Sequence, residues 1–93
     1  MIVGVMRIDL AILEARTLKD KRRAIKSLKQ RLRDRFNVSV AEVDCHDVHK
    51  RCILGLAMVS TETRSTHSQF DLMVELVRRA PRVDLLDYQR SFY

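Results

Sequence analysis

The strict alternation of side chains over residues 2–13 constrains the fold more than any other feature of the chain. One face of this segment carries Ile2, Gly4, Met6, Ile8, Leu10 and Ile12, and the other carries Val3, Val5, Arg7, Asp9, Ala11 and Leu13. Successive side chains of a β-strand point to opposite faces of the sheet, so this pattern predicts a strand with one fully apolar face.

A long amphipathic helix is predicted over residues 18–35. Thr17 can cap its N-terminus, and Asp20 stands three residues later, where a capping box has its acidic member. Apolar residues that would face the core then recur at helical spacing: Leu18, Ile25, Leu28, Leu32 and Phe36.

Two further strands follow this helix. Residues 37–44 (NVSVAEVD) alternate and are rich in β-branched side chains, which predicts a strand, and residues 45–50 form a polar connection. Residues 51–60 (RCILGLAMVS) are an almost continuous apolar run of strand length, typical of a strand that is buried on both faces.

A second helix and a last strand complete the chain. We expect Thr63 to cap a helix that continues to about Arg79, because Pro81 cannot extend it. Its inward residues would be Phe70, Met73, Val74 and Val77, and the last strand would contain Val83, Leu85, Leu86 and Tyr88.

The order strand–helix–strand–strand–helix–strand predicts an α+β fold of the ferredoxin-like βαββαβ type, with a four-stranded antiparallel sheet and two helices on one face. Residues 1–93 would form a single domain. The helices can cover only one face of the sheet, yet residues 51–60 are apolar on both. A second copy of the chain, giving a homo-oligomer and most simply a homodimer, would cover the open face; the alternative is that the apolar patch is small and stays exposed.

Composition excludes several classes of protein. The chain lacks an apolar run of the roughly 18 residues that a membrane span needs, and its start, MIVGVMRIDL, carries charges, so we expect a cytoplasmic protein without a membrane partner. Two cysteines in 93 residues do not make a disulfide-rich scaffold. Two glycines leave no glycine-rich loop to hold a phosphate.

The strongest functional signal is the charge of the predicted first helix. Residues 16–35 contain ten basic and two acidic residues, whereas the rest of the chain contains eight basic and ten acidic ones. Six of the basic residues follow three- and four-residue spacings opposite the apolar stripe, and we call them the basic ridge: Lys19, Arg22, Arg23, Lys26, Lys29 and Arg33. A concentrated ridge of this kind suits a polyanion, and the competing interpretation is a solvated helix face.

The ridge predicts a nucleic acid, RNA in particular, as the partner. The central strands, residues 2–13 and 51–60, contain no Phe, Tyr or Trp, so they cannot stack bases as the RNA-reading versions of this fold do. Binding would therefore depend on the phosphate backbone and on shape. The alternative is a protein-interaction module that dimerises through its open sheet face and docks the basic helix on an acidic protein.

Four potential metal ligands lie close together in the second connection: Cys45, His46, His49 and Cys52. Zinc sites use four such ligands, but the spacing C-x3-H-x2-C matches no common structural zinc pattern. We therefore favour polar loop residues beside a buried strand cysteine, with no metal and no cofactor.

The sequence predicts no enzyme. Its three histidines have no evident nucleophile or acid partner, and the acidic residues are scattered. Acylphosphatases of this fold need a glycine-bearing anion loop after the first strand, and copper chaperones place two cysteines there. The corresponding residues here are 14–17 (EART), which contain neither glycine nor cysteine.

The block LKDKRRAIKSLKQRLRDRFNVSVAEV, with MIVGVMRIDL before it and LGLAMVS after it, resembles the small bacterial YlxP-like proteins, a family of unknown function. The resemblance implies a ferredoxin-like fold and no established activity. Genes of family members often neighbour those for translation initiation and ribosome-binding factor A, so the resemblance, together with the basic ridge, implies RNA or a ribosomal subunit as the partner. The matching motif residues are Leu18, Lys19, Lys21, Arg22, Lys26, Ser27, Lys29, Arg31, Arg33, Arg35, Phe36, Asn37 and Glu42. The pair Cys45 and Cys52 departs from the family pattern.

Overall fold

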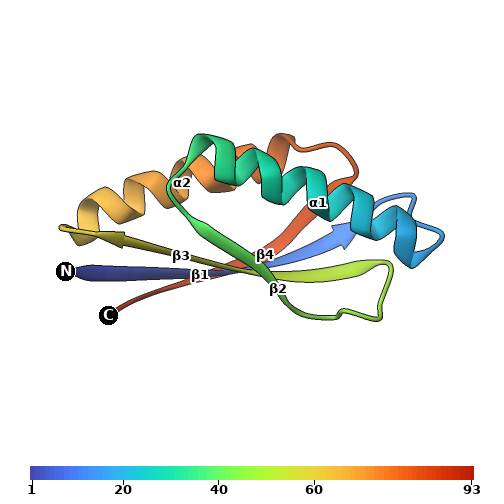
Figure 1. Cartoon of the computed structure of the whole chain (residues 1–93), viewed down its shortest axis with the longest axis horizontal. Helices are drawn as coiled ribbons and strands as arrows, with labels where there is room; N and C mark the ends of the chain where they lie inside the picture. The colour runs from blue at the N-terminus through green and yellow to red at the C-terminus, as the bar shows by residue number, and fades with distance from the viewer.

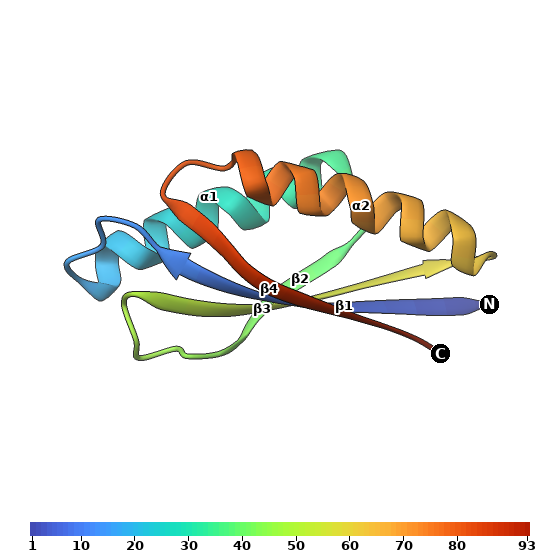
Figure 2. The same ribbon diagram turned by 180° about the vertical axis from the view of Figure 1, so that it is seen from behind.

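The computed structural model describes residues 1–93 and has the predicted order of elements. These are β1 (Ile2–Ile12), α1 (Leu18–Arg35), β2 (Ser39–Asp44), β3 (Arg51–Ser60), α2 (Thr63–Arg79) and β4 (Val83–Phe92). The strands form one antiparallel sheet in the order β2-β3-β1-β4. Both helices lie on the same face of this sheet (Figures 1 and 2), so the ferredoxin-like α+β prediction is confirmed.

The core lies between the sheet and the helices, where the alternation of β1 predicts it. Met6, Ile8 and Leu10 are completely buried, and Leu54 and Leu56 of β3 lie beside them under the helices. Gly4 marks the place where β1 passes closest to α2. A Cβ atom there would collide with the Thr66 methyl group and lie 3.1 Å from the Phe70 ring, so this position accepts no larger residue without a shift of α2.

The two helices begin in different ways. Thr17 caps α1 as predicted, because its Oγ1 accepts a hydrogen bond from the backbone N–H of Asp20 at 3.2 Å. The prediction that Thr63 caps α2 is wrong, since Thr63 already lies inside the helix and Glu62 occupies the capping position without a side-chain bond. Ser60 Oγ accepts the Glu62 N–H instead, at 3.2 Å. Neither helix has the length and apolar character that crossing a membrane requires.

The second strand begins at Ser39, two residues later than the sequence pattern suggests. The reason is local, because the N–H of Val38 bonds to the carbonyl of Phe36 in a tight turn after α1. The first strand ends at Ile12, and the N–H of Leu13 bonds instead to the carbonyl of Arg82 at 2.8 Å. This bond ties the end of β1 to the turn before β4.

The face of the sheet away from the helices is divided into two halves. The half near the chain termini is apolar, with Val3 paired to Val59 and Val5 paired to Ala57. The other half carries the ion pairs Arg51–Asp9 at 2.7 Å and Arg7–Asp44 at 4.0 Å, which flank a buried Ile53. The apolar patch is thus smaller than the pattern of β3 alone suggests, and its coverage by a second copy stays a prediction.

Candidate nucleic-acid interface

Charge is segregated between the two layers of the molecule. Helix α1 contains nine basic and two acidic residues, and α2 contains three basic and two acidic ones, so the helix layer carries a net charge of +8. The four strands contain three basic and five acidic residues, a net charge of −2. The positive potential of the protein therefore originates on the helix layer.

The basic ridge lies on the outer surface of α1. Its members are solvent-exposed except Lys29, which is half-buried, and none of them lies within ion-pair distance of a carboxylate. The five ion pairs of the structure use other cations: Arg7, Lys21, Arg51, Arg79 and Arg90. None of the six ridge cations is therefore held in an ion pair within the protein.

Arg33 differs from the other ridge residues because β2 fixes its side chain. Its Nη2 donates a hydrogen bond to the carbonyl of Val40 at 2.7 Å. The remaining guanidinium N–H groups are directed by that contact, since the guanidinium is planar and rigid. Arg33 therefore supplies a positioned charge at the C-terminal end of the ridge.

Lys21 is the one fully buried cation of α1. It is 1% exposed, and its Nζ donates hydrogen bonds to the carbonyls of Cys45 and Val48 and lies 2.8 Å from Glu42 Oε2. The ammonium group thus has two carbonyl acceptors and one close carboxylate, which together compensate for burying the lysine. The burial of Lys21 could have been predicted from the sequence. Lys21 lies four residues before Ile25 and therefore on the same, apolar face of the helix.

Glu42 completes this buried group from β2. Its Oε2 lies close to Lys21 Nζ, but the geometry of the contact does not meet that of a hydrogen bond. The contact is therefore an ion pair. Burial acts to raise the pKa of Glu42, but the contacts with Lys21 and Cys52 and the charge of Lys21 outweigh it and hold the pKa below its ordinary value. The group joins α1, β2 and the start of β3, which is a structural role.

The four metal-ligand candidates do not converge on one point. Cys52 is fully buried in the core, where burial and the neighbouring Glu42 raise the pKa of its thiol. His46 bonds through Nε2 to the carbonyl of Glu42 at 3.1 Å, and Cys45 stands in a left-handed turn with φ 62°. His49 lines a separate surface hollow. No three His, Cys, Asp or Glu side chains are grouped as metal ligands would be.

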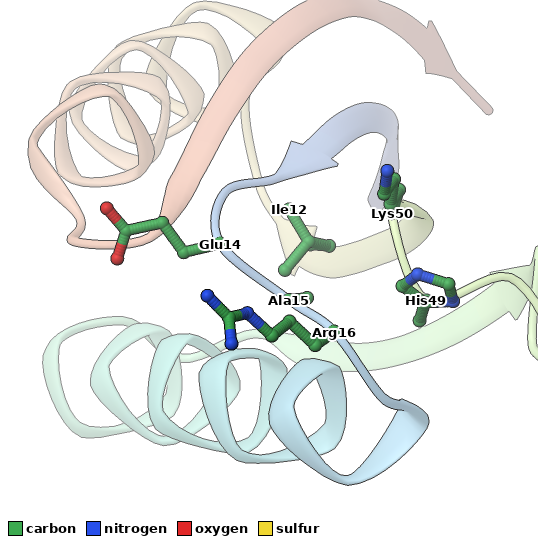
Figure 3. Close-up of a pocket in the computed structure, with 6 residues that line it drawn as sticks. All are labelled: Ile12, Glu14, Ala15, Arg16, His49 and Lys50. Carbon is green, nitrogen blue, oxygen red and sulfur yellow. The ribbon is translucent and has the colours of Figure 1, made fainter.

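That surface hollow, of about 850 Å³, lies where the β1–α1 and β2–β3 connections meet. Figure 3 shows Glu14 and Arg16 on one side of it and His49 and Lys50 on the other, with Ile12 and Ala15 between them. The two connections are joined beside the hollow, where the N–H of Ile12 bonds to the carbonyl of Lys50 at 2.9 Å. None of its charged side chains bonds to another, so it presents no nucleophile held by a base.

The sequence and the fold of this chain are similar to those of known proteins. Uncharacterized protein YlxP of Bacillus subtilis (strain 168) is 27% identical over 82 residues, covering 88% of this chain and 89% of the relative. Among solved structures, the de novo designed protein Foldit4 superposes with a TM-score of 0.58 at 11% identity, over 100% of this chain and 97% of that one. A designed protein with a ferredoxin fold gives a TM-score of 0.48 at 14% identity, over 99% and 85%.

The family model described as "Protein of unknown function (DUF503)" matches residues 3–90, which is nearly the whole chain. The match includes both helices of the helix layer in full. The resemblance to YlxP-like proteins is therefore confirmed, and the chain belongs to the DUF503 family.

Proposed function

We propose that this protein binds structured RNA, on a ribosomal subunit or in a folded transcript, through the basic ridge of α1. The observation that carries the proposal is the absence of any carboxylate partner for the six ridge cations. Phosphates would supply the missing negative charge, and each phosphate neutralised releases counterions into solution. The gene neighbourhood implied by the YlxP-like resemblance directs the first test to the ribosome.

Apart from Arg33, which bonds to the Val40 carbonyl, the side chains of the ridge make no hydrogen bond or ion pair with the rest of the fold. The buried side of α1, formed by Ala24, Ile25, Leu28 and Leu32 with Lys21, supplies its packing. On the outer side, like charges three and four residues apart, such as Arg22 and Lys26, destabilise an isolated helix by a few tenths of a kcal/mol per pair. A ridge that costs helix stability is better explained by a ligand than by packing.

The dimensions of the ridge suit a nucleic-acid backbone. Lys19 and Arg33 lie fourteen residues apart on one helix, about 21 Å at 1.5 Å per residue. If all six cations neutralised phosphates, the logarithm of the binding constant would fall with the logarithm of salt concentration at a slope between about −4 and about −5. Contacts of this kind carry little sequence preference, because phosphates are the same at every step.

A binding titration with a fluorescent RNA hairpin tests the proposal. Wild-type protein is expected to bind with steep salt dependence between about 50 mM and about 200 mM. A charge-reversal variant, Arg22→Glu, Lys26→Glu and Lys29→Glu, should lose binding. A matched control that reverses Lys50, Arg64 and Arg78 changes the net charge equally at exposed positions off the ridge and should retain most of it.

A competition arm separates RNA from an acidic protein as the partner of the ridge. Bulk structured RNA should displace the hairpin at far lower charge concentration than polyglutamate does, because closely spaced phosphates attract more condensed counterions. Equal displacement by both polymers would favour an acidic protein partner. Loss of binding in both the ridge variant and its matched control would contradict a localised interface.

A further inference from the structure

A concave hollow of about 210 Å³ lies between α1 and the turn that joins α2 to β4. Figures 1 and 2 both show this turn beside α1 on the helix face of the molecule. Arg23 and Arg31 of α1 and Arg82 of the turn line the hollow, and the small residues Ser27 and Ala80 leave the space between them open.

The three arginines that line the hollow have no protein partner. Arg23 and Arg82 are exposed and Arg31 is half-buried, and none of their guanidinium groups takes part in an ion pair or a side-chain hydrogen bond. Asp20 and Glu14 line an adjoining hollow together with Arg23 and Arg82. The pKa of the Asp20 carboxyl is lowered, mainly by the backbone N–H of Arg16, which donates to it at 3.1 Å, and in smaller part by the charge of Arg23, which is not within ion-pair distance.

The backbone at Arg82 strengthens the case for this site. Its φ of 68° lies in the left-handed region, where glycine fits without strain and most other residues cost stability. The conformation is fixed, because the Arg82 carbonyl accepts the Leu13 N–H at 2.8 Å. Glu14 and Cys45 also have a positive φ, but neither of them is a cation. Arg82 is, and it adds a third positive charge to the hollow. Strained positions of this kind concentrate at functional sites.

We infer that Arg23, Arg31 and Arg82 form a phosphate-binding notch that receives a backbone phosphate of the RNA lying along the ridge. This inference rests on the proposed function and deepens it by fixing one contact point. Arg23 belongs to both features, so the notch continues the ridge toward α2. Guanidinium groups match phosphate oxygens in bidentate geometry, and the exposed Ser27, which also lines the hollow, carries a hydroxyl that can donate a further bond.

Single substitutions that each remove one charge test the notch within the same RNA titration. Arg82→Asn is the informative change, because asparagine tolerates the left-handed conformation and preserves the turn. We expect it to weaken RNA binding roughly tenfold and to reduce the salt slope by about one. Arg64→Gln is the matched control, an exposed arginine near the start of α2, and it should change affinity less than about twofold.

Unfolding in urea shows whether the Arg82→Asn protein keeps the stability of the wild type, as the inference requires. If RNA binds to the wild type but Arg82→Asn and Arg64→Gln weaken it equally, the notch is overturned while the ridge stands. If RNA does not bind to the wild type, the proposed function fails. A titration with pyrophosphate, followed by amide NMR shifts, then decides the notch alone.

In that titration, saturable shifts at Ser27, Arg31 and Arg82 that disappear in Arg82→Asn would support a site for small phosphate compounds. Their absence would overturn the notch. If both ligands bind, competition between pyrophosphate and the RNA hairpin tests whether they share the site, and failure to compete would contradict the placement of an RNA phosphate there.

Discussion

Lys21 Nζ lies 2.8 Å from Glu42 Oε2 and so joins the first turns of α1 to strand β2 beneath it. Next to it along the chain, Arg22 is exposed and unpaired. One helix thus carries two kinds of cation, a buried one that holds the β2–β3 connection and a ridge of exposed ones. The two kinds should respond differently to substitution.

Replacing Lys21 with methionine is expected to destabilise the fold strongly. The change would leave the buried Oε2 atom of the half-buried Glu42 without its cation and the carbonyls of Cys45 and Val48 without their donor. Removing one member of a buried pair typically costs about 3 kcal/mol or more, here a large part of the stability of a small domain. Equilibrium unfolding in urea, followed by circular dichroism, measures the loss.

The double variant Lys21→Met with Glu42→Leu is the control for this interpretation. It removes both charges, so the penalty of an unpaired buried carboxylate disappears and part of the lost stability should return. If Lys21→Met alone lowers the free energy of unfolding by less than about 1 kcal/mol, the contact between Lys21 and Glu42 contributes no more than a surface ion pair.

Glu42 should also make the stability of the protein depend on pH. Its pKa is lowered in the folded state, so its contribution is fully present above the unfolded value of about 4.3 and is lost as the pH falls through the folded value. Between about pH 5 and about pH 3, the wild type should therefore lose more unfolding free energy than Glu42→Gln does. Parallel urea-derived stability curves for the two proteins would contradict this linkage.

The two cysteines should differ in reactivity. Cys52 is completely buried and the pKa of its thiol is raised, mainly by burial, so little thiolate forms and reagents reach it only on unfolding. Cys45 is half-buried in the β2–β3 connection and remains accessible. Alkylation followed by intact-mass analysis should show one rapid and one slow modification. Two modifications at the same rate under native conditions would show that the core opens readily.

Gly4→Ala tests the close approach of β1 and α2. The added methyl group would collide with Thr66 and crowd the Phe70 ring, which belongs to the packed core. Overpacking of this kind typically destabilises by 1–3 kcal/mol, so we expect a loss of about 2 kcal/mol in urea unfolding. The control is Ala57→Gly on the open face, which removes a methyl group outside the core and should cost less than about 1 kcal/mol.

Local patterns in the sequence were sufficient to predict the fold. The alternation of β1 and the spacing of Ile25, Leu28 and Leu32 are direct consequences of strand and helix geometry. The prediction that Thr63 caps α2 was wrong because several Ser and Thr residues lie near the start of this helix. Only the structure shows that Ser60 Oγ accepts the Glu62 N–H. Capping depends on backbone angles that composition does not specify.

The candidate site was only half predictable. The ridge follows from spacing along one helix, whereas the notch requires Arg82 to meet Arg31, 51 positions earlier in the chain. That meeting depends on how α2 lies against α1, which is a property of packing. Lys21 and Glu42 both appeared among the family motif residues, but their pairing also depends on a contact between separate elements.

Co-sedimentation with purified ribosomal subunits, at low and at moderate salt, tests the central claim most directly. The proposed function predicts that wild-type protein pellets with a subunit at low salt, that moderate salt weakens the association, and that the variant with Arg22, Lys26 and Lys29 changed to Glu stays in the supernatant. The Lys50, Arg64 and Arg78 reversal should still pellet. Failure of the wild type to pellet at low salt, with both variants folded, would contradict binding of ribosomal RNA by the ridge.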